Sequence, residues 1–473
     1  MARRKALDRA GIENRRVLKS RRLDKSQGIG SLSQELLLEI FSLLPFTDLL
    51  NCRSVSQLWK QVASDDSLWR SHYRENFGRL ASGSIKELDG NWLNHFRQRY
   101  NWHLGKCSIR SIQLGAHEKQ RLTACAGGQF IFNLSARHQE LTVLDIGTAK
   151  VLARSKLGDI VSCERWKYDE NNITDFSAHW EDVNPQIAVG NQFGDILILE
   201  YNVALTEFMV RAWLPMGLKT GVFPVRKISC KFPLVAALHS DFVLTIYSIT
   251  TEGIPEKVYQ ARAGHFTRDN FALAIDRSSV LDSDPASFCV SIAHNQKLLV
   301  DSWAVCLQEF HFDSLCNLHV TRMAKMKPKE PSSFATPTCI TYKYPYLLTG
   351  HDNNNLSLYS VSSTSSQLRI KLGEPLPGHT SGVQHINVGK HGRAISMAHG
   401  YNFLRWDLDD ALESKKPVAG TLLNGTPRHF VGESSCTFSG DFFHFDEDSS
   451  LLVVDLVDQH ANKNLIIYDF TVN

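Results

Sequence analysis

Polar side chains recur at one position of a pattern that repeats along this chain of 473 residues. Each copy of the pattern has an apolar or aromatic marker residue, and four polar residues stand eight positions before it: Asn191, His239, His351 and His460. Two more lie near that position in their own copies, namely His294 and His399. Imidazoles can ligate a metal ion, if several converge, or exchange a proton near neutral pH. Such residues can instead be turn residues that hydrogen-bond to their own blade, so the sequence leaves both interpretations open.

Motifs of known enzyme chemistry are absent from the sequence. It contains no G-x-S-x-G, no Walker-type phosphate loop, no G-x-G-x-x-G after a strand and no H-E-x-x-H. The ten cysteines form no C-x-x-C pair, which leaves zinc and thioredoxin-like sites without support. We therefore expect a non-catalytic protein without a cofactor, and we assign no catalytic residue and no metal ligand.

The elements that must position the polar residues are clusters of strands. From Arg121 onward, apolar and polar residues alternate in clusters separated by turn residues. The third strand of each cluster has a marker residue: Leu144, Leu199, Tyr247, Leu307, Tyr359, Trp406 and Tyr468. The spacing between Tyr247 and Tyr359 is about twice that between the other markers, so we infer a further copy between them, near Leu307. Seven copies, roughly fifty residues apart, predict a seven-bladed all-β propeller over residues 107–473.

The first and last strands of this region are expected to pair. The sequence ends just after a third strand, whereas residues 107–114 form an alternating strand ahead of the first full cluster. If this N-terminal strand completes the last blade, the ring closes and its exposed edges disappear.

Two copies resemble the WD repeat. Residues 347–361 read like its second strand, turn and third strand, with Tyr359 in place of Trp. Residues 378–408 have family residue types at Gly378, His379, Ser396, Trp406 and Asp407. The turn Asp of the family falls at Gly400, so the usual His-Ser-Asp-Trp tetrad is incomplete.

The resemblance implies that targets bind one face of the propeller. This face is formed by the loops between the second and third strands of each blade and by the loops that connect successive blades. The residues expected there are Asn191, His239, Asp241, His351, Asp352, Asn353, His399, Tyr401 and Asn402. A reader of phosphorylated motifs needs converging arginines, and the sequence has only scattered ones such as Arg226, Arg393 and Arg405. We therefore do not predict phosphate recognition.

A dense apolar segment precedes the strands. Ser33 can cap a first helix, whose apolar residues lie on two adjoining faces: Leu36, Ile40, Leu43 and Leu44, then Leu37, Phe41 and Leu44. This is more apolar surface than one neighbouring helix can bury. Either these residues form the core of a small helical domain, or some of them form a face for another protein.

More short helices are expected up to residue 78. Pro45 ends the first, Thr47 or Asp48 can cap the second, Ser56 starts the third, and Asp65 or Asp66 can cap the fourth. A helical linker over residues 79–106 follows, in which Trp92, Phe96 and Tyr100 are spaced four residues apart. The domain order is therefore helical domain 31–78, linker 79–106 and propeller 107–473.

The helical domain resembles the F-box. The matching positions are Leu32-Ser33, 35–44, Asp48-Leu49, Val55-Ser56, Trp59 and Leu68-Trp69, with Ser33 where the family usually has Pro. The resemblance implies binding to the Skp adaptor, and through it to the cullin and RING subunits of a ubiquitin ligase. By position, the adaptor-facing residues are Leu32, Leu36, Leu37, Ile40, Phe41, Leu44, Leu49, Leu50, Val55 and Trp59.

A basic arm precedes the helical domain. Residues 1–25 hold ten Lys or Arg against three Asp or Glu, a net charge of 10 − 3 = +7, within a segment 1–30 that we expect to be disordered. Such an arm can act as an import signal, touch nucleic acid or remain solvated. We expect a cytoplasmic or nuclear protein with no membrane span, since no apolar run approaches about 20 residues, and no nucleic-acid partner.

The sequence as a whole is similar to F-box/WD-repeat proteins, with a small all-α domain followed by an all-β propeller. The first hypothesis is a non-catalytic receptor in a Skp-cullin-F-box (SCF) ubiquitin ligase, whose propeller holds an unknown protein substrate. The alternative is a WD-repeat scaffold, nuclear or chromatin-associated, without a ligase role.

Overall fold

The structure is a computed structural model that describes the chain in segments. These are residues 32–77, 90–116, 121–126, 128–135, 139–161, 166, 173–180, 183–215, 223–250, 252–262, 270–278, 286–298, 302–327, 335–389, 392–399, 402–413, 418–423, 443–446, 451–457 and 462–471. The basic arm predicted at 1–30 lies outside them. They form a helical unit and a strand-rich unit, divided within one helix between Arg97 and Gln98. In these segments no helix has the length and apolar character needed to cross a membrane.

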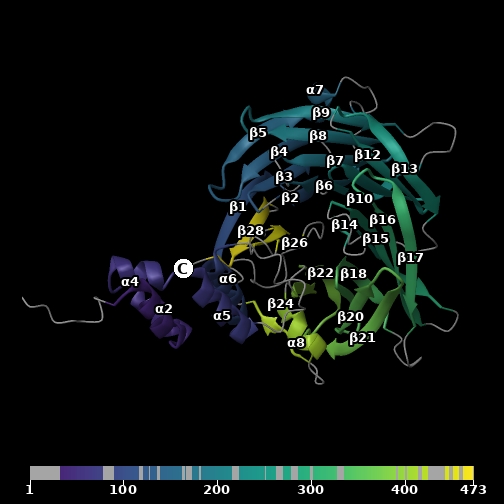
Figure 1. Cartoon of the computed structure of the whole chain (residues 1–473). Coiled ribbons are helices and arrows are strands. Elements are labelled where there is room, and N and C mark those ends of the chain that lie inside the picture. Colours follow the sequence, from purple (N-terminus) through teal and green to yellow (C-terminus); the bar gives the residue numbers. More distant parts are fainter. Residues whose placement is uncertain are drawn as a thin grey trace, which may run out of the picture. The chain divides into compact units, whose positions relative to one another are not determined.

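Four short helices and the start of a fifth build the helical unit (Figure 1). They are α2 (Gln34–Ser42), α3 (Phe46–Cys52), α4 (Gln57–Val62), α5 (Asp66–Phe77) and α6 (Trp92–Leu104). The Ser33 hydroxyl accepts from the Leu36 N–H at 3.5 Å and the Ser56 hydroxyl from the Trp59 N–H at 3.2 Å, which confirms both predicted caps. Asp65 likewise accepts from the Ser67 N–H at 2.9 Å.

The predicted cap of the second helix was wrong. Helix α3 already begins at Phe46, and Pro45 is its cap residue without any side-chain hydrogen bond. Pro45 has extended backbone angles, φ −64° and ψ 153°. Because its fixed φ suits a helix start, the helix needs no Thr47 or Asp48 cap.

Aromatic rings hold the helical unit together. The Phe96 ring lies 5.1 Å from Phe46, 5.3 Å from Trp69 and 5.4 Å from Phe77, between ring centroids. The Trp69 indole N–H donates to the Ala63 carbonyl at 2.7 Å, so this buried ring has its polar atom satisfied. The predicted linker helix thus starts as part of the helical core, through Phe96.

Seven antiparallel four-stranded sheets make up the second unit. Three of them are β2 (Arg121–Ala126), β3 (Phe130–Ser135), β4 (Glu140–Asp145), β5 (Val151–Lys156); β6 (Ile173–His179), β7 (Gln186–Asn191), β8 (Ile196–Asn202), β9 (Glu207–Leu214); and β10 (Val225–Lys231), β11 (Leu234–His239), β12 (Val243–Ile249), β13 (Pro255–Arg262). Short helix α7 (Leu157–Ile160) follows β5, and α8 (Leu408–Glu413) follows β24.

The other four sheets continue in chain order. They are β14 (Phe271–Arg277), β15 (Phe288–Lys297), β16 (Trp303–Phe312), β17 (Leu318–Met326); β18 (Pro337–Lys343), β19 (Tyr346–His351), β20 (Leu356–Ser363), β21 (Leu368–Leu376); β22 (Val383–Val388), β23 (Arg393–Ala398), β24 (Asn402–Asp407), β25 (Thr421–Leu422); and β26 (Phe443–Asp446), β27 (Leu451–Val457), β28 (Asn462–Asp469), with β1 (Ser108–Ala116). All seven marker residues lie in the third strand of their sheet, as predicted.

The sheets follow one another around a ring (Figure 1). The first strand of each sheet contacts the first strand of the next, from β2 and β6 through to β22 and β26, and β26 contacts β2. An apolar cluster fills each of the seven junctions between neighbouring sheets. These contacts are those of a seven-bladed propeller.

Strand β1 completes the last blade, as predicted. It pairs antiparallel with β28, with Ile112 opposite Leu465. The end of α6 packs on the same blade, where Trp102 stacks on Phe445 at 4.9 Å. Arg99 is only 4% exposed and donates to Asp407 at 2.8 Å, so the end of α6 contacts the propeller through a partly buried ion pair as well as apolar contacts.

Candidate functional site

Large apolar side chains are concentrated on the surface of the first three helices. Nineteen such side chains are exposed in the described segments, and six of them fall between residues 36 and 58. They are Leu36, Ile40, Leu43, Leu50, Val55 and Leu58. We call these six the apolar helical surface. Single exposed apolar residues are ordinary, but six within one small helical unit indicate an interaction site.

Helix α2 exposes one of its two apolar faces. Leu36 is 49% exposed and Ile40 44%, one helical turn apart, while Leu43 at the helix end is 85% exposed. Leu37 and Phe41, on the other face, are buried. The Ser33 cap fixes where the helix starts, and the packing of Leu37 and Phe41 into the core leaves the other face exposed.

Three residues expected to face an adaptor are instead part of the core. Leu37, Phe41 and Leu49 are at most 1% exposed, and Phe41 packs edge-on against Trp59 at 5.2 Å. The sequence could not separate the two faces because both are apolar, and a unit this small buries one of them in its own core. The expected set also lacked Leu43 and Leu58, which the structure exposes.

The remaining expected residues are accessible to different degrees. Leu50 and Val55 are exposed, whereas Leu32, Leu44 and Trp59 are half-buried. Accessibility is compatible with a binding role for these five, and their contact with an adaptor stays a prediction.

The recurring polar residues occupy equivalent places in the propeller. Asn191, His239 and His351 each end the second strand of their sheet, opposite the first residue of the first strand. His294 lies at the same level, opposite Phe271. Residues His460 and Tyr401 lie outside the described segments.

Their side chains hydrogen-bond within their own blades. The Asn191 side-chain oxygen accepts from the N–H groups of Phe193 and Asp195, at 3.0 and 2.8 Å. His351 Nε2 lies 3.2 Å from the Ser357 hydroxyl, and His239 Nδ1 lies 3.3 Å from the Phe223 carbonyl. These contacts support the interpretation as residues that hydrogen-bond to their own blade.

Burial keeps these histidines neutral. It lowers the pKa of His239 and His351 below the ordinary value and that of His294 to about 4. A proton switch near neutral pH would need a pKa near 7, so these three do not form one.

The other residues expected to bind a target differ in accessibility. Asp352, Asn353 and His399 are exposed, and Asp241 and Asn402 are half-buried. Arg393 and Arg405, considered as phosphate ligands, are buried, at 6% exposure each. Target binding at these positions stays a prediction.

Comparison with known proteins identifies both regions of the chain. The family described as "F-box protein pof12 beta-propeller" matches residues 168–440, and the family "F-box-like" matches residues 31–75. This chain belongs to the pof12-type F-box propeller family. The F-box resemblance and the fold of a helical domain followed by a propeller are therefore confirmed.

Two curated F-box proteins are similar to this member of the pof12-type family. F-box protein pof12 of Schizosaccharomyces pombe is 25% identical over 394 residues, which cover 80% of this chain and 84% of that protein. An F-box protein of Arabidopsis thaliana is 32% identical over 72 residues, which cover 15% of this chain and 26% of that protein. The propeller is thus of the pof12 type.

Proposed function

We propose that this protein is the substrate-recognition subunit of an SCF ubiquitin ligase. The F-box would dock on a Skp-type adaptor, and the propeller would hold the target protein. One observation carries the proposal: the apolar helical surface, with six exposed side chains, lies within the F-box match at residues 31–75. F-box proteins are generally non-catalytic adaptors, which agrees with the catalytic motifs missing from this sequence.

The proposed contribution is proximity. A receptor that binds the adaptor with one domain and the target with another makes their encounter intramolecular. The effective concentration of the target near the ubiquitin carrier then rises without any chemistry in the receptor itself. The cullin and RING subunits would be reached through the adaptor.

Adaptor binding can be tested with charges placed on the apolar helical surface. Leu36→Asp with Ile40→Asp should abolish co-purification with a Skp-type adaptor, because burying two carboxylates at an apolar interface is costly. Arg70→Asp with Arg74→Asp is the matched control, since both arginines are exposed on α5. Circular dichroism should show that both double variants keep their helices.

Two results would contradict the ligase proposal. One is a wild-type chain that does not bind the adaptor, and the other is unchanged binding by Leu36→Asp with Ile40→Asp. The alternative scaffold role would gain support if deleting residues 1–25 removed a salt-sensitive mobility shift of nucleic acid.

For localisation, we propose that the same arm directs nuclear import, so its deletion should move a fluorescent fusion to the cytoplasm.

A further inference from the structure

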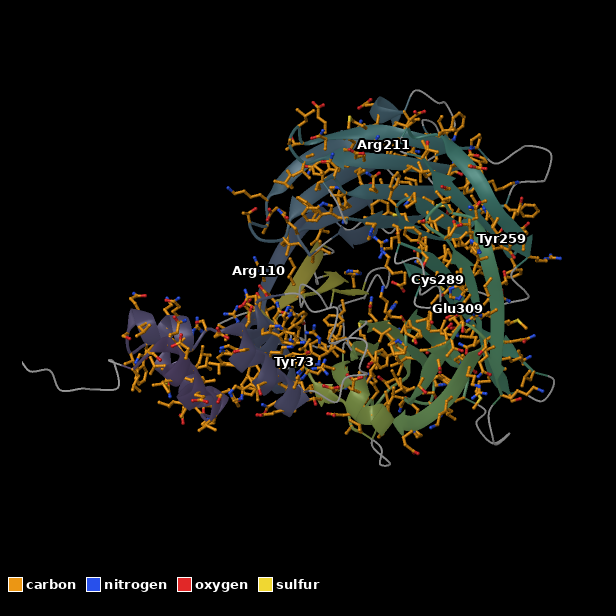
Figure 2. The ribbon with its side chains drawn as sticks, in the orientation of Figure 1. Tyr73, Arg110, Arg211, Tyr259, Cys289 and Glu309 are labelled. Atoms are coloured by element: carbon orange, nitrogen blue, oxygen red, sulfur yellow. The ribbon has the colours of Figure 1, made fainter. Side chains whose placement is uncertain are left out.

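A cysteine, a carboxylate and an imidazole meet inside the sheet β14–β17. Glu309 and His311 are two residues apart on β16 and therefore point to the same face of the sheet. Cys289 on β15 lies directly opposite His311 in the strand ladder. All three are buried, and their potential ligand atoms lie within 4.8 Å of one another. Figure 2 shows Cys289 and Glu309 together in this sheet.

The distances suit one small ion. His311 Nε2 lies 4.0 Å from Cys289 Sγ and 3.2 Å from Glu309 Oε2. Ligands about 2.0–2.3 Å from a tetrahedral zinc ion are separated by about 3.4–3.6 Å. The His311–Glu309 pair is already close to that separation, and a shift of the thiol by about half an ångström would bring the Cys289–His311 pair to it.

The surrounding groups orient these side chains as outer partners orient metal ligands. The second ring nitrogen of His311, Nδ1, lies 2.9 Å from the Ser278 hydroxyl. The Tyr342 hydroxyl donates to Glu309 Oε1 at 3.0 Å, and the Ser363 hydroxyl donates to Oε2 at 2.6 Å. A ligating imidazole and a ligating carboxylate are held in this way in metalloproteins.

The charges also match a divalent cation. Glu309 is 2% exposed, and in the described segments its ion-pair partner is the buried His311. A buried carboxylate is costly unless it is paired or bound to a metal. One Zn²⁺ with a thiolate, a carboxylate and a neutral imidazole has no net charge, so the ion would neutralise the site.

We propose that Cys289, Glu309 and His311 form a zinc site in the propeller. The Cys289 S–H bond breaks as the Zn–S bond forms, and the thiol proton leaves to solvent. His311 binds through Nε2 and keeps its proton on Nδ1, which then donates to Ser278. An oxygen ligand, either a water molecule or the Ser291 hydroxyl 3.4 Å from Cys289 Sγ, fills the fourth position. Sequence reasoning missed the site because strand pairing brings position 289 beside 309 and 311.

The test measures metal on the full chain. The protein is stripped with a chelator, reloaded with Zn²⁺ and passed through a desalting column, and its metal content is then determined by mass spectrometry. The proposal expects one zinc per chain. Loading with Co²⁺ should give the visible bands of a tetrahedral ion together with a thiolate-to-cobalt charge-transfer band, because cysteine is a ligand.

Variants assign the ligands. Cys289→Ser should lose the charge-transfer band, and His311→Gln should lose most of the retained zinc. Cys230→Ser is the control, because Cys230 is a buried free thiol in another sheet, and it should load like the wild type.

X-ray absorption of the zinc-loaded wild type needs no variant, and it should show one sulfur neighbour with nitrogen and oxygen neighbours. No retained zinc, an unchanged thiolate band in Cys289→Ser, or a zinc shell without sulfur would each overturn the proposal.

Discussion

At the scale of single residues, three buried side chains of one blade form a hydrogen-bond network. The Trp406 indole N–H donates to the Ser396 hydroxyl at 2.8 Å, and the Ser396 O–H is then free to donate to His379 Nε2 at 2.6 Å. His379 Nδ1 is buried without a described partner. The expectation of an incomplete tetrad rested on Gly400, which lies outside the described segments.

Protonation of His379 should weaken the fold. Burial lowers the pKa of His379 to about 4, against about 6.5 in an unfolded chain. Between these values the unfolded chain binds more protons, so stability is present above about pH 6.5 and is lost as the pH falls toward 4, by up to about 1.4 kcal/mol per pH unit. His379→Gln should reduce the fall in urea midpoint between pH 7 and pH 5.

The control for this pH effect is His103→Gln, because His103 is exposed at the end of α6. The prediction would be contradicted if the urea midpoints of His379→Gln and wild type changed equally with pH. His379 would then titrate alike in the folded and unfolded chain.

At the scale of elements, ring closure depends on a strand from the far end of the sequence. Ile112 of β1 is 7% exposed and packs in one cluster with Ile131 and Leu144 of the first blade and Leu465 and Ile467 of the last. This strand therefore holds the first and last blades together. Closure removes the free edge that an open sheet would present to other chains.

Shortening Ile112 should destabilise the propeller. Ile112→Ala removes buried methyl groups and leaves a cavity, which costs about 2–5 kcal/mol in typical cores. Ser111→Ala on the same strand is the control, since Ser111 is exposed and should change stability by about 0.5 kcal/mol or less. Chemical unfolding followed by tryptophan fluorescence measures both. Equal midpoints for the two variants would refute the closing role of β1.

The elements were more predictable than the faces that they present. Strand alternation and the marker residues predicted all seven sheets. Outer strands such as β17 alternate in burial with a period of two, whereas inner strands such as β11 are buried throughout. Helix α2 is apolar on both sides, so the helical period of the sequence could not distinguish the exposed Leu36 from the buried Leu37. Cys289, Glu309 and His311 converge only through the register of β15 and β16, which the spacing of the residues does not reveal.

At the scale of the whole molecule, the proposed function separates binding from modification. The apolar helical surface belongs to the helical unit, and the expected target-binding residues belong to the propeller. A change confined to the former should therefore leave target capture intact. A chain that loses adaptor binding but still binds its targets is a result that neither domain could give alone.

The double variant Leu36→Asp with Ile40→Asp should trap targets in cells. Wild-type receptor would release its targets to degradation, so they should accumulate on it only when the proteasome is blocked. The variant should retain the same proteins without that block, with less ubiquitin on them and longer half-lives, because the ligase is no longer brought near. Affinity purification with quantitative mass spectrometry measures all three, and Arg70→Asp with Arg74→Asp should behave like the wild type. Equal ubiquitin on the captured proteins of wild type and variant would contradict a receptor role.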